Sequence, residues 1–179
     1  TVTGGAGTNS ISALANSTVI GLTAFSGIQT ISGGAFTGVS IAGSANADTL
    51  DFSTVTLTGI TKIDGGAGND TITGSAGADT ILGSGGDDVL NGGAGDDIFQ
   101  YTGTSNGFDA VTGGSGNDTI AALAASTVIG ISSIAGIETI TAGGFSSVTI
   151  AGSGGADTLN FAGVTLTGIA SINGGAGND

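Results

Sequence analysis

The chain has 179 residues, 38 of them glycine, and its 14 acidic residues against one basic residue, Lys62, give a net charge of −13. Histidine and cysteine are absent, which excludes disulfides, the common zinc sites and nucleophile–base pairs that need a thiol or an imidazole. A single cation offers phosphates no basic surface, so we expect no nucleic-acid partner and look for a cationic partner instead.

Hydrophobic residues make up 39% of the chain, which is too many for an acidic disordered segment. Short runs of Ile, Val, Leu, Ala and Thr alternate with Gly, Ser, Asn and Asp, for example over residues 17–43. This pattern predicts short strands joined by turns and no helix. No stretch is long and apolar enough to span a bilayer, so we expect no membrane insertion, and we expect any export signal to lie outside this segment.

A nine-residue motif recurs along the chain. It has glycine at its first place, aspartate at its sixth and an apolar residue at its eighth. Four consecutive copies fill residues 65–100, and three inserted residues at 101–103 interrupt them. The other copies are isolated, degenerate or truncated, except for the well-formed 113–121; they lie at 43–51, 104–112, 152–160 and 174–179.

A second period of 109 residues is superimposed on the first, because residues 4–70 align without a gap on 113–179. We expect one continuous β-solenoid over 1–179, with a first unit at 4–112, a core nonapeptide run at 65–121 and a partial second unit at 113–179. Since the units do not coincide with the ends of the chain, we expect a window of a longer tandem array.

Nine residues suit half a coil of such a solenoid. Glycines in the first six places can adopt positive φ, and the last three places form a very short strand with one inward side chain. Two motifs then make an 18-residue coil, and stacked coils bury a ladder in which Ile72 lies on Leu90 and Ile81 on Phe99. The longer spacings between isolated motifs predict wider coils and leave five, five and a half or six coils per unit open.

The same stacking aligns the sixth-place aspartates in two rows, one along each edge. Neighbouring aspartates within a row are about 4.8 Å apart, which is the spacing of adjacent strands. Like charges this close oppose folding unless a cation lies between them. Carboxylate and loop carbonyl oxygens are the ligands of a hard cation and favour Ca²⁺ over Mg²⁺. One edge carries Asp70, Asp88 and Asp109, and the other carries Asp79, Asp97 and Asp118.

The run from Gly65 to Gln100 resembles the RTX repeat family, whose nonapeptide GGxGxDxUx is a calcium-binding repeat. The resemblance implies an all-β fold, a right-handed parallel β-solenoid (the RTX β-roll) with several Ca²⁺ ions between its coils. It implies carboxylate ligands from well-formed loops at Asp70, Asp79, Asp88, Asp97 and Asp118, and from poorer loops at Asp48, Asp109, Asp157 and Asp179. It also implies carbonyl ligands in these loops, assigned to Gly65, Ala67, Gly74, Ala76, Gly83, Gly85, Gly92, Ala94, Gly113 and Ser115.

Some positions allow a second interpretation. Asn9 stands where Asp118 stands in the next unit, so a weaker or absent site is expected there. The fifth-place residues Asp87 and Asp96 are expected to face solvent, and the seven phenylalanines are expected to pack in the core or at its ends. Paired carboxylates could serve glycoside hydrolysis, but a catalytic pair should be unique and these aspartates recur in each coil, so we predict no enzyme.

We interpret the chain as a calcium-binding structural segment of a long repetitive extracellular bacterial protein, such as a surface fibre, matrix filament, surface layer or adhesin stalk. The resemblance implies type I secretion followed by folding on Ca²⁺ outside the cell, in which ligand binding and folding are coupled. Self-association is expected because the coils of one chain can stack on those of another. The alternative is the secretion and folding module of an exported toxin, protease or lipase.

Overall fold

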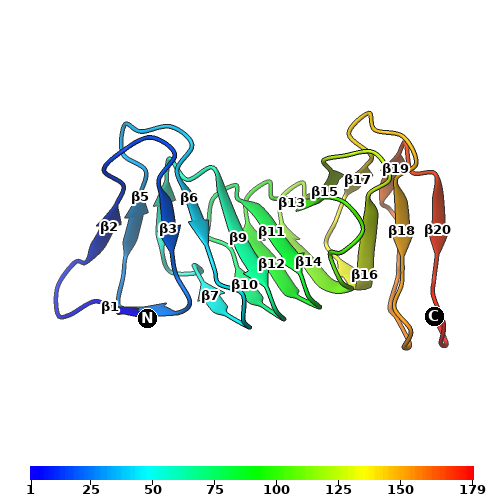
Figure 1. Cartoon of the computed structure of the whole chain (residues 1–179), viewed down its shortest axis with the longest axis horizontal. Helices are drawn as coiled ribbons and strands as arrows, with labels where there is room; N and C mark the ends of the chain where they lie inside the picture. The colour runs from blue at the N-terminus through cyan, green and yellow to red at the C-terminus, as the bar shows by residue number, and fades with distance from the viewer.

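A computed structural model describes all residues from Thr1 to Asp179. It contains twenty short strands and no helix, and every strand pair is parallel (Figure 1). No helix is therefore present that is long and apolar enough to cross a membrane. The chain winds as a parallel β-solenoid of stacked coils, which confirms the predicted all-β fold.

Two sheets run along the rod. One has seven strands, β7 (Thr49–Asp51), β10 (Thr71–Thr73), β12 (Val89–Ala94), β14 (Asp109–Ser115), β16 (Val128–Ala135), β18 (Thr149–Ala151) and β20 (Ser171–Asn173). The other has eight, β3 (Val19–Gly21), β6 (Ser40–Ala42), β9 (Lys62–Ala67), β11 (Thr80–Gly85), β13 (Ile98–Tyr101), β15 (Thr119–Ala122), β17 (Thr139–Thr141) and β19 (Thr165–Thr167).

The nonapeptide coils have only these two faces, and their core is the predicted ladder. Ile72 aligns with Leu90 and Ile81 with Phe99, and all four side chains are buried. Each nonapeptide supplies one such inward residue, so the core is a single row per sheet and each coil depends on its neighbours for burial. The ladder belongs to one continuous apolar cluster that extends from Leu22 to Ile150.

The N-terminal coils are wider and have a third face. This face is the sheet β2 (Ser10–Ser12), β5 (Thr30–Ser32) and β8 (Thr56–Thr58), and a short pair β1 (Val2–Thr3) and β4 (Phe25–Ser26) lies beside it. Figure 1 shows this broader end on the left. Ile31 aligns with Leu57, a coil of 26 residues, whereas Ile63 aligns with Ile81 after 18. The additional residues in the wide coils thus form an additional strand.

The registers of the wide coils recur 109 residues later. Ser10 pairs with Thr30 and Thr119 with Thr139, and likewise Val19 pairs with Ser40 and Val128 with Thr149. The sequence repeat is therefore also a repeat of strand pairing.

One unit contains five coils, one of the values that the sequence left open. Five coil steps lead from Val2 to its counterpart Val111. The residues that align in succession are Val2, Phe25, Leu50, Ile72, Leu90 and Val111. The step from Phe25 to Leu50 rests on the hydrogen bond from the Thr49 N–H to the Thr23 carbonyl. At the spacing of adjacent strands, one unit advances the rod by about 24 Å.

The phenylalanines differ in their burial, and Phe108 and Phe161 are half-buried. Phe52 and Phe99 are fully buried, and Phe25 stacks on Phe52 with ring centroids 5.0 Å apart, as expected for core packing. Phe36 and Phe145 are instead 37% and 41% exposed, on loops that connect β5 to β6 and β17 to β18. For these two residues the expectation of core packing was wrong.

Candidate metal sites

The sixth-place aspartates form hydrogen-bonded rows along the two edges of the rod. The backbone N–H of Asp70 donates to Oδ1 of Asp88 at 2.8 Å, and that of Asp97 donates to Oδ1 of Asp118 at 2.9 Å. The same contact recurs from Asp48 to Asp70, from Asp88 to Asp109 and from Asp79 to Asp97. Stacking thus fixes one carboxylate oxygen of each residue and brings the predicted ligands together in the predicted rows.

The second oxygen is left without a partner in four of these residues. Oδ2 is buried and accepts no hydrogen bond in Asp70, Asp88, Asp97 and Asp118. A buried acceptor with no donor costs about 1–3 kcal/mol, and more when it is charged. These four atoms are where a cation would stabilise the fold.

A backbone carbonyl from the next coil lies beside three of these oxygens, those of Asp70, Asp97 and Asp118. A Cβ added to Gly65 would collide with Asp70 Oδ2 and would lie 2.9 Å from the carbonyl oxygen of Gly83, the first place of the next coil. At Gly92 the corresponding neighbours are Asp97 Oδ2 and the Gly113 carbonyl. Only glycine fits at the first place, because the space beside it is occupied by oxygens of two coils. Two converging acceptors without a donor match the ligand preference of Ca²⁺.

The four loops that contain the unpartnered oxygens share a backbone conformation; they are 65–70, 83–88, 92–97 and 113–118. Their second and fourth places have positive φ, for example +102° at Gly66 and +100° at Gly68. Glycine adopts this region without strain. The loop at 83–88 has Ser84 at its second place, with φ +72°, and the Ser84 hydroxyl donates to Asp64 Oδ1 at 2.7 Å.

Burial of these carboxyls is unfavourable to their charge. Burial is the main cause that raises the pKa of Asp88 and Asp97 to about 6, and it also raises the pKa of Asp70 and Asp118. Neighbouring carboxylates add to the shift, since a like charge disfavours ionisation. The edges therefore carry charge that favours a counter-cation.

Three other predicted ligands are already satisfied by serine. In the loop of Asp79, the backbone N–H and the hydroxyl of Ser75 donate to Oδ2 at 2.6 and 2.9 Å. Asp48 accepts the N–H of Ser44, and Asp157 accepts both donors of Ser153. Their second and fourth places lack positive φ. We call these the serine-closed loops.

Asp109 and Asp179 differ from both groups. Tyr101, the first inserted residue, donates its hydroxyl to Asp109 Oδ2 at 2.8 Å, and burial raises the pKa of this carboxyl to about 7. Oδ1 of Asp179 accepts the N–H of Asp157 at 3.2 Å, and Asp179 is exposed.

The predicted carbonyl ligands of the first and the third place lie in different surroundings. First-place carbonyls, such as those of Gly83 and Gly113, lie beside the unpartnered oxygens. Third-place carbonyls of Gly85 and Ser115 instead accept backbone hydrogen bonds from Gly68 and Gly95 at 2.7 and 2.9 Å. The remaining predicted third-place residues, Ala67, Ala76 and Ala94, lie in the same loops.

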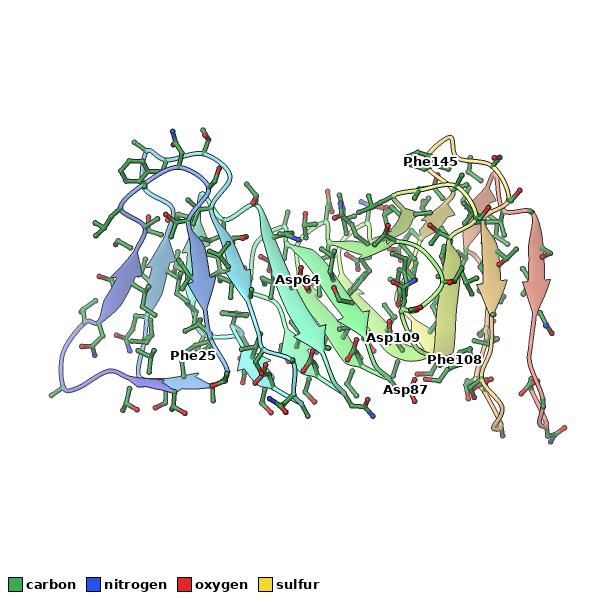
Figure 2. All side chains as sticks on the ribbon, in the orientation of Figure 1. Phe25, Asp64, Asp87, Phe108, Asp109 and Phe145 are labelled. Carbon is green, nitrogen blue, oxygen red and sulfur yellow. The ribbon has the colours of Figure 1, made fainter.

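The fifth-place residues are exposed, as expected, and form an outer row of hydrogen bonds. Asp87 Oδ1 accepts the N–H of Phe108 at 2.9 Å, and Asp96 Oδ1 accepts that of Asn117 at 2.9 Å. Figure 2 shows Asp87, Asp109 and Phe108 near one another at the lower edge of the rod.

Sequence reasoning missed Glu138. Its Oε2 accepts the N–H of Asp118 at 2.7 Å, in the way that an aspartate of the next coil would. The signal was present, because Glu138 is the only glutamate of the chain and follows Asp118 by 20 residues, about one coil. It lies outside the nonapeptide pattern, so the pattern could not identify it.

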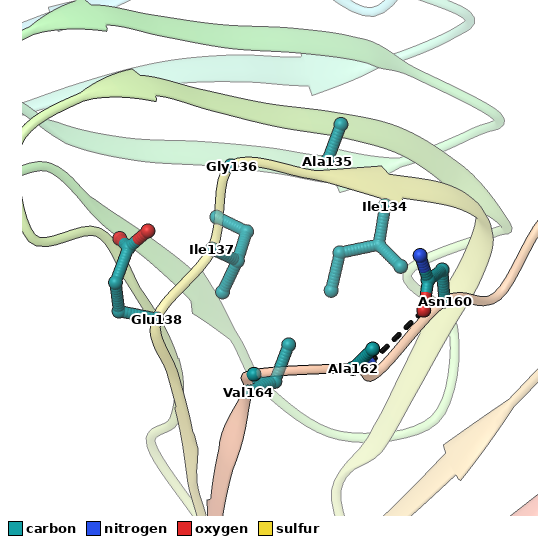
Figure 3. A pocket seen from close by; sticks show the side chains of 9 residues that line it. Ile134, Ala135, Gly136, Ile137, Glu138, Asn160, Ala162 and Val164 are labelled. Carbon is teal, nitrogen blue, oxygen red and sulfur yellow. Dashed lines mark hydrogen bonds between the residues drawn. The ribbon is translucent and has the colours of Figure 1, made fainter.

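A surface hollow of about 430 Å³ lies beside Glu138 between residues 134–138 and 160–164 (Figure 3). Ile134, Ile137 and Val164 line it, and Glu138 is its only acidic residue. In the first unit the corresponding positions of Ile134 and Phe161 hold the stacked pair Phe25 and Phe52. The hollow thus contains no pair of carboxylates.

Comparison with protein families agrees with this geometry. The family model for the RTX calcium-binding nonapeptide repeat (4 copies) matches residues 64–99, 104–125 and 135–163. RTX repeats bind several Ca²⁺ ions between their coils, and the β-roll they form is a structural calcium-binding fold. Comparisons with curated proteins and with solved structures found no significant match.

Proposed function

Since the chain belongs to the RTX calcium-binding nonapeptide repeat family, we propose that it is a calcium-stapled, rod-like structural segment of a long extracellular protein. The family supports a Ca²⁺-binding repeat module of an exported bacterial protein, and RTX proteins are typically exported by type I secretion. The finer role, a fibre, filament, surface layer or adhesin stalk that folds on Ca²⁺ after secretion, is the part that we propose.

The observation that carries the proposal is the set of four buried, unpartnered Oδ2 atoms. Those of Asp70, Asp97 and Asp118 lie beside a carbonyl of the next coil, so one ion at each of these junctions would join two coils. We therefore assign Asp70, Asp88, Asp97 and Asp118 as the principal carboxylate ligands. Serine-closed Asp48, Asp79 and Asp157 would bind more weakly, because the ion must first displace serine donors, and Asp109 must release Tyr101.

The recurrence of strand registers supports a rod over a compact module. Each five-coil unit repeats the pairing of the one before it, so an array of units extends in one direction by about 24 Å per unit. A solenoid of this kind lengthens along its axis as units are added.

Self-association of such rods is part of the proposal. Leu14 is 87% exposed and its counterpart Leu123 is 41% exposed, and exposed Phe36 and Phe145 also recur once per unit. Solvent-exposed apolar side chains at a fixed period give each rod equivalent positions for lateral contact.

Electron microscopy of the native protein with and without Ca²⁺ tests the proposed role. We expect rods in Ca²⁺ whose length grows by about 24 Å for each 109-residue unit, and disordered chains after chelation. Compact particles with a separate globular domain beside one short calcium block would favour the alternative, a secretion module of an exported enzyme or toxin.

A further inference from the structure

One coil junction has the same backbone contact in both units but different side chains. In the first unit the N–H of Asn9 donates to Gln29 Oε1 at 2.8 Å. In the second unit, 109 residues later, the N–H of Asp118 donates to Glu138 Oε2 at 2.7 Å. The backbone contact is preserved, while two neutral amides replace two carboxylates.

The side-chain amide of Asn9 reveals where the oxygens of this junction converge. Its Nδ2 donates to the carbonyls of Gly5, Gly7 and Gly27 at 2.8, 3.3 and 3.0 Å. Gly5 and Gly7 belong to the loop of Asn9, and Gly27 belongs to the next coil. Three carbonyls from two coils therefore point at one donor, as they would point at a cation between coils.

The same junction in the second unit has an acceptor where Asn9 has its donor. Asp118 is buried and its Oδ2 has no hydrogen-bond partner. A Cβ added to Gly113 would collide with this oxygen and with the carbonyl of Gly136, the counterpart of Gly27. Here the convergent groups are all acceptors, so a donor or a cation is missing from the protein's own atoms.

Glu138 completes this junction although no nonapeptide surrounds it. Its carboxylate fixes the N–H of Asp118 and places a second negative charge next to that residue. At the first-unit junction Gln29 provides the same acceptor without charge.

We propose that the residue pair at this position sets whether the coil junction takes a cation: Asn9 and Gln29 close it with a side-chain amide, whereas Asp118 and Glu138 require Ca²⁺. Glu138 is a positioning residue for the ligand Asp118. This inference rests on the proposed function, in which Ca²⁺ lies between coils.

Exchange of the two pairs tests the proposal by calcium titration calorimetry. The double variant D118N/E138Q should bind one Ca²⁺ fewer than the unmodified chain, and N9D/Q29E should bind one more. E138Q alone should keep the stoichiometry and weaken one site, because glutamine keeps the acceptor and loses the charge. D51N and N16D are matched controls in exposed positions and should leave the stoichiometry unchanged; Asn160 already stands at the counterpart of Asp51.

A second measurement covers the case in which D118N/E138Q fails to fold. N9A should lower the melting temperature equally at limiting and at saturating Ca²⁺, whereas N9D should lower it at limiting Ca²⁺ and recover at saturating Ca²⁺. Unchanged stoichiometry in both double variants, or equal behaviour of N9A and N9D, would overturn this inference. Absence of Ca²⁺ binding by the unmodified chain in the same titration would instead overturn the proposed function.

Discussion

The nonapeptide coils and the wide coils share one core but close their edges by different means. In the nonapeptide coils, buried carboxylates such as those of Asp70 and Asp97 lie beside carbonyls, and their Oδ2 atoms have no donor. In the wide coils, side chains satisfy the turns, as when Thr18 donates to the Ala15 carbonyl at 2.7 Å and Asn16 accepts the N–H of Thr37 at 2.9 Å. We therefore expect calcium dependence to be a local property of the edges, whereas burial of the ladder is common to the whole rod.

Removal of calcium should have the largest effect. Chelation leaves the four unpartnered carboxylates buried without a counter-charge, and each coil depends on its neighbours. We expect loss of the β-type circular dichroism signal, with hydrogen exchange accelerating first over residues 65–121 and later over the wide coils. An unchanged spectrum in chelator would show that the two regions do not differ in this way.

A first-place glycine should be the most sensitive single residue. Gly92→Ala forces a Cβ against Asp97 Oδ2 and the Gly113 carbonyl, so we expect a loss of more than about 3 kcal/mol in calcium, measured by urea denaturation. Gly5→Ala is the matched control in the wide region. Its Cβ would meet nothing within 4 Å, and a change of about 0.5 kcal/mol or less is expected. Similar losses would refute the close approach at the first place.

Alanine substitutions of a sixth-place and of a fifth-place aspartate should differ in their loss of stability by less than the two glycine substitutions do. Asp88→Ala removes the acceptor for the Asp70 N–H and one proposed ligand, so we expect a loss of about 2–3 kcal/mol in saturating Ca²⁺. Asp87→Ala removes only an exposed hydrogen bond to the Phe108 N–H, and about 0.5–1 kcal/mol is expected. Equal urea midpoints for the two variants would contradict the ligand assignment.

The smallest effect should be the pH dependence of the calcium-free protein. Burial raises the pKa of Asp88 and Asp97 to about 6 and that of Asp109 to about 7, against 3.8 as the ordinary value. The folded state thus binds these protons more tightly than the unfolded chain does, so their contribution is full below about pH 4 and is lost as pH rises through 6 to 7. In chelator, part of the β-type circular dichroism signal that is lost at pH 8 should therefore return at pH 5. In Ca²⁺ the urea midpoint should instead rise from pH 5 to pH 8, because protons compete with the ion.

Much of the fold followed from the period of the sequence. A motif of nine with one apolar place fixes which side chains face inward, and the pairs Ile72–Leu90 and Ile81–Phe99 lie where that rule put them. The rows of aspartates followed from the same spacing. The third face of the wide coils did not, because its strands β2, β5 and β8 carry no motif and pair at irregular spacings of 20 and 26 residues.

The chemistry of individual loops was less predictable than their positions. The loops at 74–79 and 83–88 both begin Gly-Ser, yet Ser75 closes on Asp79 while Ser84 turns to Asp64. That choice depends on a contact 20 residues away in sequence, which a local motif does not contain. Tyr101 and Glu138 act on aspartates of the motif from outside it for the same reason.

A unit of five whole coils has a consequence for multivalent recognition. Because no fraction of a coil remains, the β5–β6 loop of one unit and the β17–β18 loop of the next emerge on the same side of the rod, as Figure 1 shows at its upper edge. In the proposed array of such units, equivalent surfaces would recur about every 24 Å along the axis. A ligand with linked binding groups at that spacing gains effective concentration with every unit it spans, so weak contact at one unit becomes avidity along the array.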